Sequence, residues 1–214
     1  MVHRWPDDHA AASVLRSYVE RLERGEEGEL DAAGLDFRGA DLRGLSLRSA
    51  DFGRARLEGV SFRAGQLNRT DFSQASISGA CFDDAEMMGA DLFGVSAERA
   101  RFVNAWLSGL DALDANLRSA DFRKAFLGGV SFNGADLEGA DLGDARLERT
   151  FFVSSRLVNA RVEGMNGTLI GPCKVDEDVW LADADLQQWF RERGADVTVI
   201  AVNAATADIP EPPT

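Results

Sequence analysis

The stretch ADLRGLSLRSADFGRARLEG, residues 40–59, shows the pattern that decides the fold of this chain. It divides into four units of five residues, and the central residue of every unit is Leu or Phe. The pattern runs without a shift from Phe37 to Val162, and of its 26 central positions 24 are Leu, Phe, Ile, Met or Val; only Ala97 and Ala112 depart. Two residues before each centre stands a second series, in which 16 of 26 residues are Ala. A period of five matches neither the roughly 3.6 of a helix nor the roughly 2.0 of a strand, so the chain must turn after every unit.

The positions of Phe predict how many units make one coil. Eight of the nine central Phe fall in two columns when positions are sorted by a period of twenty, and the two columns occupy opposite sides. These columns are Phe62, Phe82, Phe102 and Phe122, and Phe52, Phe72, Phe132 and Phe152. Stacked rings on two sides and aliphatic residues on the other two would fill an interior at uniform density. The two exceptions fit, because Ala97 follows Val95 and Ala112 follows Leu110, so a larger neighbour replaces the missing volume.

The A-D-L/F-x-x units resemble the pentapeptide repeat family over about 130 residues. The resemblance implies an all-β solenoid, a right-handed quadrilateral parallel β-helix with four units per coil and therefore about 6.5 coils. All five prolines lie outside the repeat, as expected where each backbone N–H bonds to the next coil.

Both ends of such a rod need protection, because they present open strand edges. We expect an N-terminal helical cap in residues 1–30, with a helix over 8–24 whose apolar residues are Val14, Leu15, Tyr18, Val19 and Leu22. The β-helix itself is predicted over 31–164. The period is lost after Val162, and GMNGTLIGPC, 164–173, reads as a loop.

Residues 165–203 follow as a C-terminal segment, with a helix over 183–193 and a short strand over 196–202, and 204–214 as a flexible tail. Within the family, a helix followed by a strand resembles the segment through which gyrase-interacting members dimerise; the alternative is a plain cap. The residues concerned are Trp180, Leu186, Trp189, Phe190, Val197 and Val199.

The residues that catalysis or metal binding would need are scarce. Histidine occurs only at 3 and 9, so the rod lacks the usual general base and metal ligand. The two cysteines, Cys81 and Cys173, form neither a zinc motif nor a disulfide framework, which favours a reducing, cytoplasmic compartment. No apolar stretch is long enough for a membrane span. We predict no enzyme activity, cofactor or metal.

One column of acidic residues is unusual. The position before the central residue reads Asp51, Asp71, Asp91 and Asp111 on the face centred on Phe52, and Asp114 lies beside it. Asp at this position generally bonds to turn backbone. Four carboxylates one coil apart nevertheless repel by roughly 1 kcal/mol per neighbour in water, so the column is a candidate interaction surface.

Charge is unevenly distributed around the predicted rod. The chain carries a net charge of −13, which argues against nucleic acid or an anionic membrane as partner, but the rod itself carries only −3. The face with the Asp column sums to −4 and the face centred on Leu47 to +2. On the latter, Trp106 and Phe126 should stack outward, and with Phe151 they make a predicted aromatic patch.

Two classes of function therefore remain. In the first, the chain is a rigid scaffold for an unidentified protein partner. In the second, it resembles family members that mimic duplex DNA, bind DNA gyrase or topoisomerase IV, and protect these enzymes from quinolone-type toxins or inhibit them as such toxins do. The Asp column favours the second class, while the modest charge of the rod opposes it.

Overall fold

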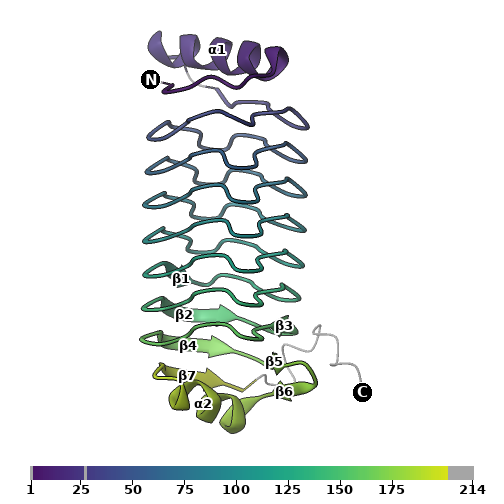
Figure 1. Cartoon of the computed structure of the whole chain (residues 1–214). Helices are drawn as coiled ribbons and strands as arrows, with labels where there is room; N and C mark the ends of the chain where they lie inside the picture. The colour runs from purple at the N-terminus through teal and green to yellow at the C-terminus, as the bar shows by residue number, and fades with distance from the viewer. Residues whose placement is uncertain (1, 27, 202–214) are drawn as a thin grey trace.

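The computed structural model of the chain describes residues 2–26 and 28–201 as a rod with one helix at each end (Figure 1). Isolated parallel bridges join residues twenty positions apart along most of its length, for example Asp51 to Asp71 and Ser61 to Cys81. The Phe52 N–H donates to the Asp71 carbonyl at 2.8 Å, and the Asp71 N–H donates back to Ala50 at 2.9 Å. The twenty-residue period predicted from the Phe columns is confirmed.

The corners of the rod explain the period of five. After each central residue, a turn closes with a backbone hydrogen bond, such as Ala55 N–H to the Phe52 carbonyl at 2.9 Å. The second residue after the centre has positive φ, for example 59° at Asn104 and 66° at Gly109. This left-handed conformation suits Gly and Asn, which recur at that position.

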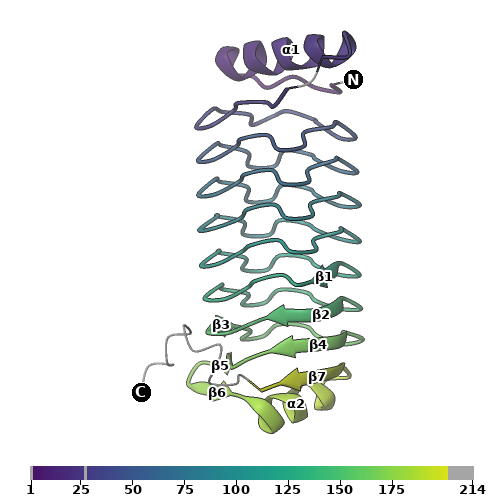
Figure 2. The same cartoon turned by 180° about the vertical axis from the view of Figure 1, so that it is seen from behind.

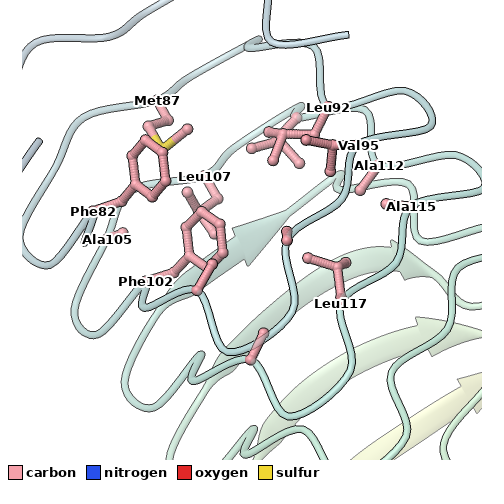
Figure 3. Close-up of a cluster of buried hydrophobic side chains, with 14 of the residues drawn as sticks. Phe82, Met87, Leu92, Val95, Phe102, Ala105, Leu107, Ala112, Ala115 and Leu117 are labelled. Carbon is pink, nitrogen blue, oxygen red and sulfur yellow. The ribbon is translucent and has the colours of Figure 1, made fainter. Parts of the chain in front are cut away.

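The interior is filled by the central residues. Phe82 lies between Phe62 and Phe102, with ring centroids 5.0 Å and 5.1 Å away and nearly parallel planes. Figure 3 shows the aliphatic residues around Ala112, where Leu92 and Val95 lie beside the smaller side chain. The remaining gaps between Leu92, Leu110 and Ala112 are too narrow to admit a water molecule.

The N-terminal helix α1 runs from His9 to Glu23, close to the predicted span, and lies across one end of the rod (Figure 2). Asp8 caps it by accepting from the Ala11 N–H at 2.9 Å. Leu15 and Tyr18 are buried, and the Tyr18 hydroxyl donates to the Ser46 carbonyl at 2.9 Å. The segment before the helix was not anticipated: Arg4 forms an antiparallel bridge with Asp41, which pairs the first exposed edge.

The named strands gather at the C-terminal end of the rod. One sheet runs in the order β1-β2-β4-β7 and consists of parallel strands: β1 Phe126–Gly128, β2 Arg146–Phe151, β4 Asn166–Ile170 and β7 Asp196–Ile200. The other runs β3-β5-β6, with β3 Ser155–Arg156, β5 Cys173–Asp176 and β6 Val179–Leu181. Helix α2, Asp183–Glu192, precedes β7, so the predicted helix and strand are both present.

The prediction of a loop at 164–173 is wrong. This segment contains β4 and the start of β5, and β4 continues the parallel pairing of the rod. The five-residue pattern disappears because the coil shortens: Phe151 pairs with Ile170, nineteen residues on, and Ser155 pairs with Cys173, eighteen on. Gly167 occupies the central position opposite Leu147, which removes the expected large residue. The tail predicted at 204–214 lies outside the described residues.

Candidate interaction surface

The rod has four faces, which we name after their first central residues in chain order: Phe37, Leu42, Leu47 and Phe52. Each face comprises five-residue segments that recur every twenty residues, so 46–50, 66–70 and 86–90 belong to the Leu47 face. The Leu47 and Phe52 faces are neighbours, as are the Phe37 and Leu42 faces. This division matters because charged and apolar side chains are distributed differently on the two halves.

The predicted Asp column exists as consecutive rungs of the Phe52 face. Bridges join Asp51, Asp71, Asp91 and Asp111 in order, and a further bridge joins Asp31 to Asp51. Asp31 was missed because the repeat was counted only from Phe37. Ala32 is the central residue of this additional unit, and Leu30 stands two residues before it; both are buried. The large Leu30 compensates for the small centre, as Leu110 does for Ala112.

We call these five residues, Asp31, Asp51, Asp71, Asp91 and Asp111, the Asp ladder. One carboxylate oxygen of Asp51 accepts from the Gly53 N–H at 2.8 Å, and Asp91 accepts from Phe93 at 2.7 Å. Asp71 and Asp111 accept in the same way from Ser73 and Leu113. The ladder carboxylates therefore serve the turn backbone, as Asp generally does, while their outer oxygens remain available.

Ion pairs lie elsewhere on the rod. Within residues 35–164, all of which the structure describes, every ion pair within 4 Å joins side chains of the Phe37 and Leu42 faces. Arg101, for example, lies 2.7 Å from the buried carboxylate of Asp83 and 3.6 Å from Asp121. We call these two faces the ion-paired side and the other two faces the open side. Neither the Asp ladder nor Asp114 has a cationic partner among the described residues.

The ion pairs shift the acidity of their carboxyl groups. A hydrogen bond from the Arg38 guanidinium lowers the pKa of Asp36 to about 2, and Arg43 lowers the pKa of Asp41 in the same way. Since these carboxyl groups are less acidic in the unfolded chain, pairing stabilises the fold fully above the unfolded pKa, about 3.9. That stability disappears as the pH falls from there towards 2.

This predicts a specific acid dependence. The urea concentration at the midpoint of unfolding should be lower at pH 2.5 than at pH 5. Asp36→Asn should make this difference smaller, because the titrating group is gone. The measurement is urea denaturation at the two pH values. An equal fall in Asp36→Asn and in the natural chain would contradict the assignment.

The three residues of the predicted aromatic patch differ in exposure. Trp106 is 56% exposed, whereas Phe126 and Phe151 are half-buried. The ring centroids of Trp106 and Phe126 are 5.6 Å apart, but the ring planes are tilted by 47°, so the predicted stacking is wrong. Phe126 separates two surface hollows, one beside Trp106 and one extending to Phe151.

Three further exposed apolar residues escaped sequence analysis. Met88, Phe93 and Leu113 are 43%, 38% and 36% exposed. Each follows a central residue, at a position where Arg and Glu are the most frequent residues, and that contrast could have revealed them. Together with Trp106, they are the large apolar side chains more than about a third exposed in residues 35–164, and all four lie on the open side.

The C-terminal residues divide into two groups. Leu186, Phe190 and Val197 are buried within the chain itself. Trp180, Trp189 and Val199 are half-buried, and the guanidinium carbon of Arg193 lies 4.2 Å from the centroid of Trp189. The buried group stabilises the packing of α2 against β7, whereas a role in dimerisation stays a prediction.

Residues suited to catalysis are dispersed. His3 and His9 lie at the N-terminal end, and the described residues contain no group of three His, Cys, Asp or Glu able to hold a metal ion. Cys81 and Cys173 are free, and burial raises the pKa of the Cys173 thiol. Among the described residues, no helix is long and apolar enough to cross a membrane.

The four-sided rod and its five-residue units agree with the sequence comparison. The model of the pentapeptide repeats matches residues 31–63, 55–94, 98–134 and 135–166, with eight copies. The chain belongs to the pentapeptide repeat family. The right-handed quadrilateral β-helix that the resemblance implied is the fold of this family. No curated protein sequence matches the chain significantly.

Solved structures of other pentapeptide repeat proteins resemble the rod at low identity. A trypsin-treated variant of QnrB1, a plasmid-mediated fluoroquinolone resistance protein, is 18% identical, with 79% of this chain and 95% of that one covered and a TM-score of 0.39. HetL, involved in heterocyst differentiation regulation in the cyanobacterium Nostoc, is 22% identical, with 86% and 92% covered and a TM-score of 0.27. A protein from the Arabidopsis thaliana thylakoid lumen is 22% identical, with 73% and 81% covered and a TM-score of 0.26.

Proposed function

We propose that this pentapeptide repeat protein is a non-enzymatic scaffold whose open side binds another protein. The observation that carries the proposal is the separation of the two sides. Ion pairs occupy the Phe37 and Leu42 faces, whereas the Asp ladder and the exposed side chains Met88, Phe93, Trp106 and Leu113 occupy the other two. Exposed apolar groups beside unpaired charges are typical of protein contact surfaces.

The physical reasoning concerns what binding would cost on each side. Covering the ion-paired side would remove water from charged side chains that already pair with one another. This would contribute little to the free energy of binding. The open side offers apolar area for burial and carboxylates without internal partners. Because the stacked rings and coil-to-coil hydrogen bonds hold the backbone in place, binding there loses little conformational entropy.

We also propose that the protein is located in the cytoplasm, because its free thiols suit a reducing compartment.

A capture experiment tests the scaffold proposal. The natural chain and a Trp106→Ala/Phe126→Ala variant are immobilised beside a control, Arg38→Ala/Arg123→Ala, altered on the ion-paired side. We expect a partner from the source organism to bind the natural chain and the control but to bind the aromatic variant at least about tenfold more weakly, as for interface anchors. Equal binding to all three, or loss only in the control, would contradict the use of the open side.

The Asp ladder favours a second candidate, mimicry of duplex DNA towards a type II topoisomerase. Its five carboxylates follow the rod at about 4.8 Å per rung, so they extend over about 19 Å. One strand of DNA carries a phosphate about every 3.4 Å along the helix axis, a comparable spacing. The ladder is confined to one face, and this is why we rank mimicry second.

Replacing Asp71, Asp91 and Asp111 by Asn separates the two candidates. Asn116 already accepts from the Arg118 N–H at 3.3 Å, so Asn can keep the turn hydrogen bond. The variant should still fold. Its free energy of unfolding should be unchanged or higher by up to about 2 kcal/mol, because the repulsion between neighbouring carboxylates is removed. Under mimicry, inhibition of gyrase supercoiling by the natural chain should largely disappear in this variant, as should the salt dependence of binding.

The matched control is Asp41→Asn, Asp121→Asn and Asp141→Asn, which removes the same charge from the ion-paired side. It should lose stability, because Arg43 and Arg123 lose partners, but it should still inhibit. If the ladder variant inhibits gyrase as strongly as the natural chain at every salt concentration, the mimicry proposal is wrong. If neither the natural chain nor the ladder variant inhibits gyrase, while the aromatic patch binds another protein, only the scaffold proposal remains.

A further inference from the structure

One column of side chains runs along the whole Leu47 face. It consists of the residue before each central position, and backbone pairing joins every member to the next, first through isolated bridges and then through β1, β2, β4 and β7 (Figure 1). We call it the Leu47 column; its members, in order, are Ser46, Gln66, Glu86, Trp106, Phe126, Arg146, Asn166 and Asp196. None of these residues is buried. At about 4.8 Å per rung, the column is about 34 Å long.

The order of side chains in the Leu47 column is self-complementary about its midpoint, which lies between Trp106 and Phe126. The residues at equal distances from this midpoint are Trp106 and Phe126, Glu86 and Arg146, Gln66 and Asn166, and Ser46 and Asp196. The first pair is aromatic, the second has opposite charges, the third consists of two amides, and the fourth joins a hydroxyl to a carboxylate. Each half of the column therefore matches the other half read in reverse.

A second copy of the chain, lying antiparallel, presents the Leu47 column in reverse order. In a twofold contact every pair of residues occurs twice, because residue i contacts j and j contacts i. With the axis at the midpoint of the column and perpendicular to the rod, Trp106 of one copy faces Phe126 of the other, and Glu86 faces Arg146. A shift of one rung in either direction would separate Glu86 from Arg146. The charges therefore favour a single register.

The shape of the Leu47 face also suits a contact with itself. Trp106 is 56% exposed, whereas Phe126 is half-buried and lies between two hollows of about 440 and 450 Å³. Gly128 and Gly129 line the second hollow, so no side chain from these positions fills it. The protruding indole ring of one copy can therefore enter the space beside Phe126 of the other.

The charges that would meet across the contact have no ionic partners within the chain. Glu86 and Arg146 are exposed, and among the described residues neither forms an ion pair within 4 Å. The segment 86–90 carries a charge of −1 from Glu86. The segment 146–150 carries +1, from two Arg and one Glu. Opposite charges facing each other across an interface fix its register and exclude other arrangements.

We propose that the chain forms an antiparallel twofold dimer through its Leu47 face. The axis runs along the strands of this face, so both Phe52 faces, with their Asp ladders, point to the same side of the dimer. This inference goes beyond the proposed function, because the occupant of the Leu47 face is a second copy and the Asp ladders remain exposed to another protein. A protein that binds Trp106 must displace the second copy.

Charge reversal with rescue tests the dimer, with sedimentation velocity of the full chain as the measurement. The natural chain should show a monomer–dimer equilibrium. Glu86→Lys should raise the dissociation constant at least about tenfold, because two repulsive contacts replace two ion pairs. Adding Arg146→Glu to this variant should restore the dissociation constant to within about threefold of the natural value, because the charges match again.

The matched control for Glu86→Lys is Asp114→Lys. It makes the same charge change at an exposed position of the Phe52 face, which the dimer leaves free. Lys124 has a φ of 60° at the equivalent position of its own unit, close to the 56° of Asp114, so the backbone accepts Lys there. The control should leave the dissociation constant unchanged. Circular dichroism of every variant checks that the fold is retained.

Disulfide cross-linking tests the antiparallel orientation in a Cys81→Ser background. Gln66→Cys/Asn166→Cys should give a covalent dimer on mild oxidation, because these two positions face each other. Gln66→Cys alone should give none, because its two copies lie five rungs apart, about 24 Å. In a parallel dimer the two copies of position 66 would lie on the same rung.

Several results would overturn the proposal. One is a chain that remains monomeric at about 100 μM, where a dimer with a micromolar dissociation constant would be populated. Others are a dimer that Glu86→Lys does not weaken, a loss that Arg146→Glu does not restore, and cross-linking by Gln66→Cys alone. Sedimentation requires no other protein, so failure of the dimer and failure of the proposed function are distinguishable.

Discussion

Phe82→Ala is expected to lower the free energy of unfolding by about 3 to 5 kcal/mol. The Phe82 ring is fully buried and stacks on Phe62 and Phe102, and it meets Phe72 edge-on with centroids 5.6 Å apart. Removing it opens a cavity in the middle of a column of rings. Rungs above and below hold the backbone apart through hydrogen bonds between coils, so the cavity cannot collapse. Urea denaturation followed by circular dichroism measures the loss.

Two further variants make this result specific. Phe82→Leu keeps most of the volume. It should lower the free energy of unfolding by less than about 1.5 kcal/mol, as conservative core exchanges usually do. Phe93→Ala removes the same side chain from the exposed position of the open side and should change stability by no more than about 0.5 kcal/mol. A cost below about 1.5 kcal/mol for Phe82→Ala would mean that the column of rings does not support the rod.

Deleting residues 180–214 should make the protein aggregate. The deletion removes β7, which pairs with β4 over five residues, and with it Leu186 and Phe190 of α2, which are fully buried. The bare edge of β4 and the apolar surface around Leu169 would then face solvent, and an unprotected strand edge pairs with other chains. Light scattering and size-exclusion chromatography measure the outcome.

Two variants distinguish capping from dimerisation. A deletion of only 203–214 leaves α2 and β7 in place and should remain soluble. Ile200→Asp alters an exposed residue at the end of β7, so it should leave a monomeric cap intact but disrupt a twofold contact through this strand. A soluble, unchanged monomer after deletion of 180–214 would contradict the capping role. A dimer unaffected by Ile200→Asp would contradict dimerisation through the end of β7.

Much of the fold could be predicted because the repeat has a constant period. Once every coil contains twenty residues, the position of any residue in the sequence assigns it to a face and a rung, and Phe82 must lie between Phe62 and Phe102. The same reasoning placed Trp106 next to Phe126 and Asp71 between Asp51 and Asp91. It failed at 164–173, where the coil shortens to nineteen and then eighteen residues while the strands still pair.

The candidate surface depended more on the tertiary structure. The sequence alone determined the rod, its columns and the excess of negative charge on the Phe52 face, because these follow from backbone hydrogen bonds repeated at a fixed interval. Only the tertiary structure decided that acidic residues of the Phe37 and Leu42 faces are paired with arginines. Arg101 contacts carboxylates on the rungs before and after its own, and Arg123 contacts one on its own rung and one on the next. Whether a long side chain makes such a contact depends on its rotamer and on the space left by its neighbours across the coil. Those distances are set by packing between residues about twenty positions apart, and they separate an ion-paired side from an open one.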